Sequence, residues 1–213
     1  MGLDWNPGNK PKPGHEEEFR RIYEALGETT DEVERNALLS RFEEISVSAF
    51  ETLGTPRVGH DEAATAWARD IYEKNERDIP FEDWVKKIWG FYVLPLVAPC
   101  DGLPLYTNGS PAGYVESYAF RGKFLDDCEG IIGGALLESA YVSKLPDGLL
   151  PYGKALIERA EAFAAERGID LAGLEKTPPE DPDSDEFRLH VVMSAGRWCI
   201  FWAERGHFLD SYW

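Results

Sequence analysis

The sequence predicts an all-α protein, a single-domain bundle of about seven or eight helices over residues 1–213. Apolar residues recur along most of the chain at spacings of three and four, the period of an amphipathic helix. No convincing series of strands is visible, because regular alternation of apolar and polar residues is not sustained. The chain is 43% hydrophobic and contains seven Trp, which is enough apolar material for a packed core.

The first 14 residues hold three Pro and three Gly and cannot form a helix. Leu3 and Trp5 are apolar, so we expect this irregular arm to dock on the body of the protein. The first helix begins near His15 and ends at Gly27, with three glutamates in its first turn that complement the helix dipole. Its inward face consists of Phe19, Ile22, Tyr23 and Leu26.

A second helix is predicted after Thr29–Glu32, which has the pattern of a capping box. This helix has room to run on to Leu53, because the next helix breaker is Gly54-Thr55-Pro56. Further helices are expected from near Asp61 and after Pro80, which suits a first helical turn. The residues that the second helix is expected to bury are Val33, Ala37, Phe42 and Ile45.

Residues 91–117 form a long irregular tract rich in Pro, Gly and aromatic residues. The tract is too apolar for an ordinary linker, and long irregular segments within compact proteins are often functional. Helical spacing returns at Tyr114 and continues to about residue 143, as one helix or as two with a break at Gly130. Interior glycines in this segment indicate the close approach of a neighbouring part of the chain.

The C-terminal third of the chain contains two clear helices. Pro146–Pro151 is predicted to be a turn-rich joint, followed by a helix over 154–167 that Gly168 ends. Residues 175–186 hold three Pro and six acids against one Lys, which predicts an exposed loop. The last helix extends from about Phe187 to Arg205 and is apolar around most of its circumference, so we expect it at the centre of the core.

The formal net charge of −17 restricts the choice of partners. An acidic surface repels nucleic-acid phosphate and anionic membranes, so we expect neither nucleic acid nor membrane as a partner. The charge is typical of a soluble surface. An acidic inhibitor that binds a basic protein is an alternative function.

The cysteines and the N-terminus indicate the compartment. Cys100, Cys128 and Cys199 are widely spaced and include no C-x-x-C pair, and no apolar leader is visible. The longest apolar stretch, 91–99, is about half the length of a membrane span. We therefore expect a reduced, soluble, cytoplasmic protein of bacterial type.

No catalytic motif is strong. The sequence contains no phosphate loop, dinucleotide fingerprint or G-x-S-x-G elbow, so we expect no cofactor. Glu204–His207 has E-x-x-H spacing, but a helical di-iron site needs two such copies. A metal- or thiol-dependent hydrolase stays open as an alternative, with these residues: Asp126, Asp127 and Glu129 with His60 or His190.

The function expected first is binding of a small polar ligand or of a protein partner. Tyr and Asn in the tract offer rigid area with polar ends, a composition favoured at recognition surfaces. The last helix carries one polar stripe, formed by His190, Ser194, Arg197 and Glu204. If Arg197 is buried, it needs an acidic partner such as Asp126; alternatively, it could bind the anionic group of a ligand. The candidate ligand-binding residues are Tyr106, Asn108, Tyr118, Arg121, Asp126, His190 and Arg197. No residue is assigned a catalytic or metal-binding role.

Overall fold

The computed structural model describes residues 2–75, 78–98, 100, 103, 114, 115, 118–174 and 178–213. This part of the chain is mostly helical and contains only two-stranded sheets, so the predicted all-α class is confirmed. Two compact units are distinguished: a larger unit, Met1–Ala49 with Cys100–Trp213, and a smaller unit, Phe50–Pro99. Each unit is described by itself.

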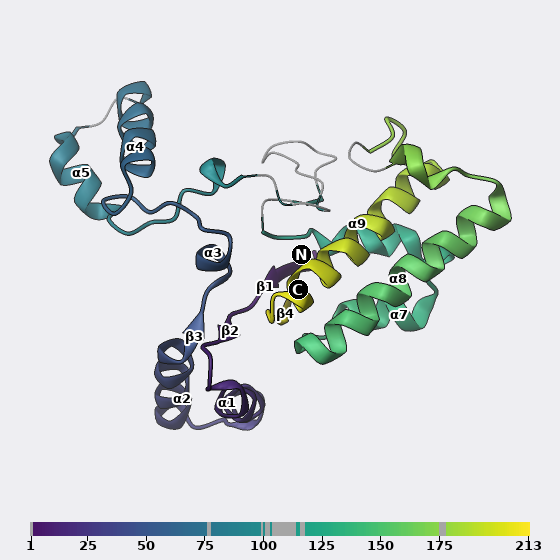
Figure 1. Ribbon diagram of the computed structural model, residues 1–213, viewed down its shortest axis with the longest axis horizontal. Helices are drawn as coiled ribbons and strands as arrows, with labels where there is room; N and C mark the ends of the chain where they lie inside the picture. Colours follow the sequence, from purple (N-terminus) through teal and green to yellow (C-terminus); the bar gives the residue numbers. More distant parts are fainter. Residues whose placement is uncertain are drawn as a thin grey trace. The chain divides into compact units, whose positions relative to one another are not determined.

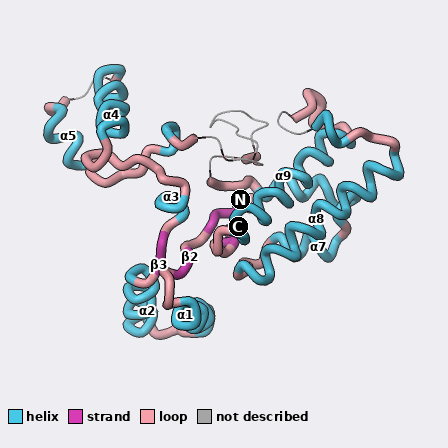
Figure 2. Tube along the Cα trace, viewed as in Figure 1, coloured by secondary structure: helices cyan, strands magenta, loops and turns pink. Residues whose placement is uncertain are grey.

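Helices dominate both units (Figure 2). The α-helices are α1 (Glu16–Glu28), α2 (Glu32–Glu44), α3 (Ala49–Thr52), α4 (Glu62–Lys74), α5 (Phe81–Lys87), α6 (Glu129–Ile132), α7 (Gly134–Ala140), α8 (Pro146–Arg167) and α9 (Asp185–Glu204). Short 3-10 helices cover Leu94–Leu96, Gly122–Cys128 and Leu171–Leu174. The strands are β1 (Asp4–Pro7), β2 (Lys10–Pro11), β3 (Ser46–Val47) and β4 (Leu209–Tyr212).

The N-terminal arm is extended and lies within the larger unit, where β1 runs beside the C-terminal strand β4 (Figure 1). The two strands pair antiparallel in the register Asp4↔Tyr212. On the other side of β1, Trp5 exchanges two backbone hydrogen bonds with Phe120, at 2.8 and 3.0 Å. Leu3 and Trp5 are buried. The predicted docking of the arm is therefore confirmed, although the strand pairing was not predicted.

Helix α9 is the central helix of the larger unit, and most of its residues are buried, as predicted. It lies along α8 (Figure 1). A Cβ atom on Gly196 would lie 2.6 Å from Ile157 Cδ1 and 2.9 Å from the backbone oxygen of Gly153. The close packing of α8 against α9 therefore depends on glycine at this crossing.

Gly196→Ala is expected to lower the free energy of unfolding by about 3 kcal/mol, because the added methyl group overpacks a crossing partly made of backbone. Urea unfolding followed by circular dichroism measures the change. The matched control is Gly27→Ala on α1, where an added Cβ meets nothing within 4 Å. Alanine at residue 27 should be neutral or stabilise the helix by up to about 1 kcal/mol. An equal decrease in the free energy of unfolding for the two variants would contradict the described packing.

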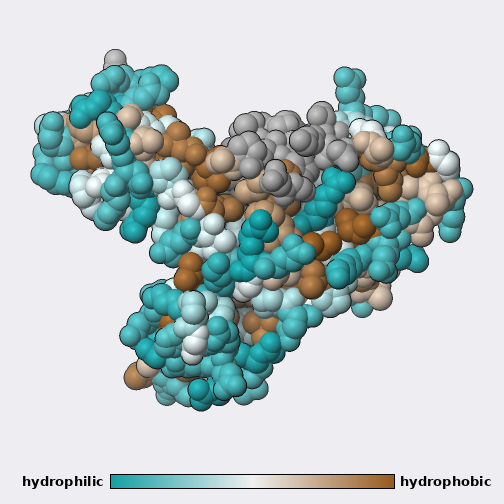
Figure 3. Space-filling view, in the orientation of Figure 1, coloured by the Kyte–Doolittle hydropathy of each residue, from teal (hydrophilic) through white to brown (hydrophobic). Residues whose placement is uncertain are grey.

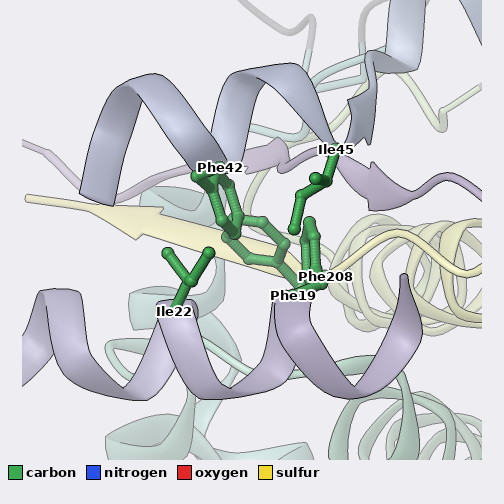
Figure 4. Close-up of a cluster of buried hydrophobic side chains, with 5 residues drawn as sticks. All are labelled: Phe19, Ile22, Phe42, Ile45 and Phe208. Atoms are coloured by element: carbon green, nitrogen blue, oxygen red, sulfur yellow. The ribbon is translucent and has the colours of Figure 1, made fainter. Parts of the chain in front are cut away.

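Helices α1 and α2 form a hairpin around a small aromatic core (Figure 4). Phe19 of α1 and Phe42 of α2 lie with ring centroids 4.4 Å apart, and Phe208 near the C-terminus packs against both. The outer part of α2 is exposed, and hydrophilic residues dominate the visible face of this hairpin in Figure 3. Val33 is 80% exposed and Ala37 is exposed, so the prediction that α2 buries them was wrong. The helix turns its other face toward α1.

Three predicted boundaries in the larger unit were wrong. Asp31, not Thr29, caps α2, because the Asp31 carboxylate accepts from the backbone N–H groups of Val33 and Glu34, both at 2.9 Å. Helix α2 ends at Glu44 rather than continuing to residue 53. The expected joint at 146–151 is instead the start of α8: Pro146 occupies the first turn, where Pro is tolerated, and Pro151 lies inside the helix.

The helix expected from Tyr114 is replaced by other structure up to Cys128, and the rest of the segment forms the two helices α6 and α7. Val115 and Phe120 form an isolated antiparallel bridge, and the 3-10 helix Gly122–Cys128 follows. The break between α6 and α7 falls at Gly133, where φ is 80°. At Gly122 an added Cβ would lie 2.7 Å from Leu3 Cγ. At this glycine, the segment that approaches closely is the N-terminal arm.

The smaller unit packs α4 and α5 around its own core. Tyr72 contacts both Phe81 and Trp84, with ring-centroid distances of 5.3 and 5.7 Å. The buried residues of this core are Val58, Ala64, Ala68, Trp84 and Val93. Across the described residues of both units, no helix combines the length and apolarity that crossing a membrane requires.

Candidate functional site

The larger unit contains a small hollow beside β1, which we call the β1–β4 groove. Its volume is about 230 Å³. The residues lining it are Asp4, Asn6, Tyr114, Tyr118, Ala119, Phe120, Arg121 and Tyr212. The groove is thus built from the N-terminal strand, the C-terminal strand and the segment around residue 120.

The alternation of β1 places its polar residues in the groove. Successive side chains of a strand point to opposite faces. Trp5 and Pro7 are buried, so Asp4 and Asn6 lie on the opposite, partly exposed face. Tyr212 is directly opposite Asp4 in the register of the sheet and is 73% exposed.

Helix α9 supports the back of the groove. Tyr114 is buried, and its ring centroid lies 5.6 Å from that of His190 in an edge-on arrangement. Trp198 Nε1 donates a hydrogen bond of 3.2 Å to the backbone oxygen of Tyr118. The groove residues at 114 and 118 are therefore positioned by the most buried helix of the protein.

Opposite charges lie side by side in the groove. Arg121 Nε is 3.7 Å from Asp4 Oδ1, and the two side chains are 48% and 49% exposed. This distance is too long for a good hydrogen bond. An exposed ion pair contributes at most about 1 kcal/mol to stability. The two side chains are thus held near each other but are not locked together.

The structure brings only some of the predicted site residues together. Tyr118 and Arg121 line the groove, and His190 lies behind it through Tyr114. Asp126 does not line the groove and instead accepts a 2.7 Å hydrogen bond from the Tyr141 hydroxyl. Arg197 also does not line it. Tyr106 and Asn108 lie outside the described residues.

His190 is built into the core. It is 1% exposed, and its Nδ1 lies 3.5 Å from Ser194 Oγ. Burial, with a smaller contribution from the positive charge of Arg197, lowers the pKa of His190 to about 4. The imidazole is therefore neutral near pH 7 and supports the packing behind Tyr114.

Two observations on the described residues bear on the hydrolase alternative. Among these residues, no group of three or more His, Cys, Asp and Glu is placed to hold a metal ion. Burial raises the pKa of the Cys128 thiol to about 12 and also raises that of Cys199. A nucleophilic thiol requires the opposite shift.

The histidine of the E-x-x-H pattern has a structural role. His207 is fully buried, and its Nδ1 lies 2.7 Å from the backbone oxygen of Gly8. At this distance the ring nitrogen donates to the carbonyl. His207 thereby connects the C-terminal segment to the N-terminal arm.

Asp4, Asn6 and Tyr212 are among the groove residues that were not predicted from the sequence. A signal for the first two was present, because Leu3-Asp4-Trp5-Asn6-Pro7 alternates apolar and polar residues as a half-buried strand does. No comparable signal pairs this strand with residue 212. The partner of a strand depends on contacts between distant parts of the chain.

Comparison of the chain with protein-family models, with curated proteins and with solved structures finds no match.

Proposed function

We propose that the protein binds a small polar ligand in the β1–β4 groove. The observation that carries this proposal is the convergence of a carboxylate, an amide and a guanidinium beside tyrosine side chains in one hollow. Ligand sites typically combine aromatic surface with a few convergent polar groups. The groove, at about 230 Å³, is smaller than the sites of drug-sized molecules, which begin near ~300 Å³. The ligand is therefore small.

Binding is favoured over catalysis by the chemistry of the lining. The described residues that line the groove include no Ser, Cys, Lys or His, four residue types that often supply nucleophiles or bases in enzyme sites. The polar groups present, Asp4, Asn6 and Arg121, are suited to orienting a bound molecule.

The proposal is tested by saturation-transfer-difference NMR with small polar probes of different charge: glucose, galactose, mannose, N-acetylglucosamine, glycine, acetate and ethanolamine. We expect at least one probe to bind. Tyr212→Ala should weaken that binding about tenfold, a loss of about 1.4 kcal/mol. Because Tyr212 is 73% exposed, its truncation should change stability by no more than about 0.5 kcal/mol.

The control for this variant is Trp213→Ala. Trp213 is the next residue in the chain, is 67% exposed and does not line the groove. Its truncation should leave probe binding unchanged. If no probe binds, or if both variants weaken binding equally, a ligand site at the groove is contradicted.

A reducing compartment such as the cytoplasm is part of the proposal. Cys128 and Cys199 are buried thiols, and neither forms a disulfide. Structural disulfides form in oxidising compartments, so thiols kept in the core support the expected location.

A further inference from the structure

We infer that the ligand of the β1–β4 groove is uncharged and rich in hydroxyl groups, such as a single saccharide unit. This inference rests on the proposed function and names the class of its ligand. It is carried by the groove's charge balance, its hydrogen-bonding groups and its tyrosines.

The charges of the described groove residues disfavour a ligand with a net charge. Asp4 and Arg121 carry opposite charges 3.7 Å apart, so together they are neutral. An anion beside Arg121 would also lie close to the Asp4 carboxylate, and it would approach a protein of net charge −17. A cation beside Asp4 would lie equally close to Arg121. Either ligand gains one attraction and suffers one repulsion of similar size.

The hydrogen-bonding groups in the groove match a pair of neighbouring hydroxyls. An ionised carboxylate only accepts hydrogen bonds, a guanidinium only donates them, and an asparagine amide does both. One ligand hydroxyl can donate to Asp4 while the next accepts from Arg121, and Asn6 can serve either. The ion pair need not separate for this arrangement.

A zwitterion is the nearest competitor, since its two charges could pair with Asp4 and Arg121. Both of its charged groups would have to lose water on binding. The free energy that this costs is about as large as the free energy gained from exposed ion pairs. Removing a hydroxyl group from water costs less free energy than removing a charged group. The comparison favours the uncharged ligand.

The aromatic residues suit a ligand with an apolar face. Tyr118 and Tyr212 contribute aromatic surface to the groove, and the buried Tyr114 lies at its base. The ring carbons of a sugar carry hydrogens that pack on aromatic surface, and a tyrosine adds a polar hydroxyl to its apolar ring. Tyrosine combines both properties at low entropic cost.

The test compares the binding of the same NMR probes by wild type, Asp4→Ala and Arg121→Ala. We expect a neutral sugar to bind more tightly than glycine, acetate and ethanolamine. Each substitution should weaken sugar binding about tenfold, because each removes a hydrogen bond to a charged group. The matched control is Asp70→Ala, which breaks the exposed Asp70–Lys74 pair on α4 and should leave binding unchanged.

The possible outcomes separate the ligand class from the site. If glycine, acetate or ethanolamine binds best and depends on Asp4 or Arg121, the ligand class is overturned while the proposed binding function holds. If a sugar binds equally well to all variants, its site lies elsewhere and the inference is overturned. If no probe binds, the proposed function itself fails.

Discussion

Replacement of Trp5 by alanine is expected to lower the free energy of unfolding by about 4 kcal/mol, the cost of truncating a fully buried tryptophan. The Trp5 side chain has no exposed surface. Its ring centroid lies 5.0 Å from that of Phe120 and 5.7 Å from that of Trp198, and Nε1 donates a 2.8 Å hydrogen bond to the backbone oxygen of Ala140. Truncation would leave a cavity and remove the shorter of two side-chain hydrogen bonds to this carbonyl, which also accepts from Ser211 Oγ at 3.2 Å.

Urea unfolding of wild type and Trp5→Ala measures this loss directly. The matched control is Trp213→Ala, the same substitution at a residue that is 67% exposed. Trp213 Nε1 donates one exposed hydrogen bond to the backbone oxygen of Tyr141, so the change should stay within about 1 kcal/mol. Because Trp5 lies between Asp4 and Asn6 on β1, its truncation should also weaken probe binding at the groove. Equal stability of the two variants would show that the arm is not part of the core.

The helices could be predicted because their evidence is local. In α1, Phe19 and Ile22 mark the inward face, and acidic residues occupy the first turn. The apolar circumference of α9 likewise indicated a central helix before any packing was known. Helical spacing was less informative for α2. Val33 and Ala37 share a face by spacing, but the partner helix α1 contacts another face, and spacing alone does not identify the partner.

The candidate site was only partly predictable because it joins the two ends of the chain. Tyr118 and Arg121 were chosen from the composition of their own segment, and they line the groove. Asp4 and Tyr212 meet through strand pairing across almost the full length of the sequence. A strand of four residues has a weak local pattern, and its register is set by contacts that form only in the folded protein.

Acidification from pH 7 to pH 4 is expected to destabilise the protein by about 3 kcal/mol for each of two buried histidines. Burial is the main cause that lowers the pKa of His190 and of His207 to about 4, against an ordinary value of 6.5. The positive charge of Arg197 adds to the effect at His190, and those of Lys10 and Arg205 add to it at His207. Both imidazoles are therefore neutral in the folded protein over a range in which the unfolded chain protonates them.

The sign of this change in stability follows from proton binding. Between pH 6.5 and pH 4 the unfolded chain binds more protons than the folded protein, so stability falls as the pH falls. Each histidine contributes a slope that approaches about 1.4 kcal/mol per pH unit in this window. Glu18 affects stability at lower pH. Hydrogen bonds from Arg41 lower the pKa of the Glu18 carboxyl to about 2, so its contribution to the stability of the folded protein is lost only as the pH falls below about 4.5.

Urea unfolding at half-unit steps from pH 7.5 to pH 4.5 measures how the free energy of unfolding changes with pH. The same measurement on a double variant, His190→Asn with His207→Asn, identifies the residues responsible. The asparagine amide at residue 207 can still donate to the backbone oxygen of Gly8, but neither asparagine titrates. The double variant should lose most of the pH dependence between pH 6.5 and pH 4.5, whatever its stability at pH 7. His60→Asn, at an exposed residue of the smaller unit, should retain the wild-type slope. A double variant whose slope equals that of wild type would show that the acid sensitivity has another origin and that these two imidazoles are not held neutral by the core.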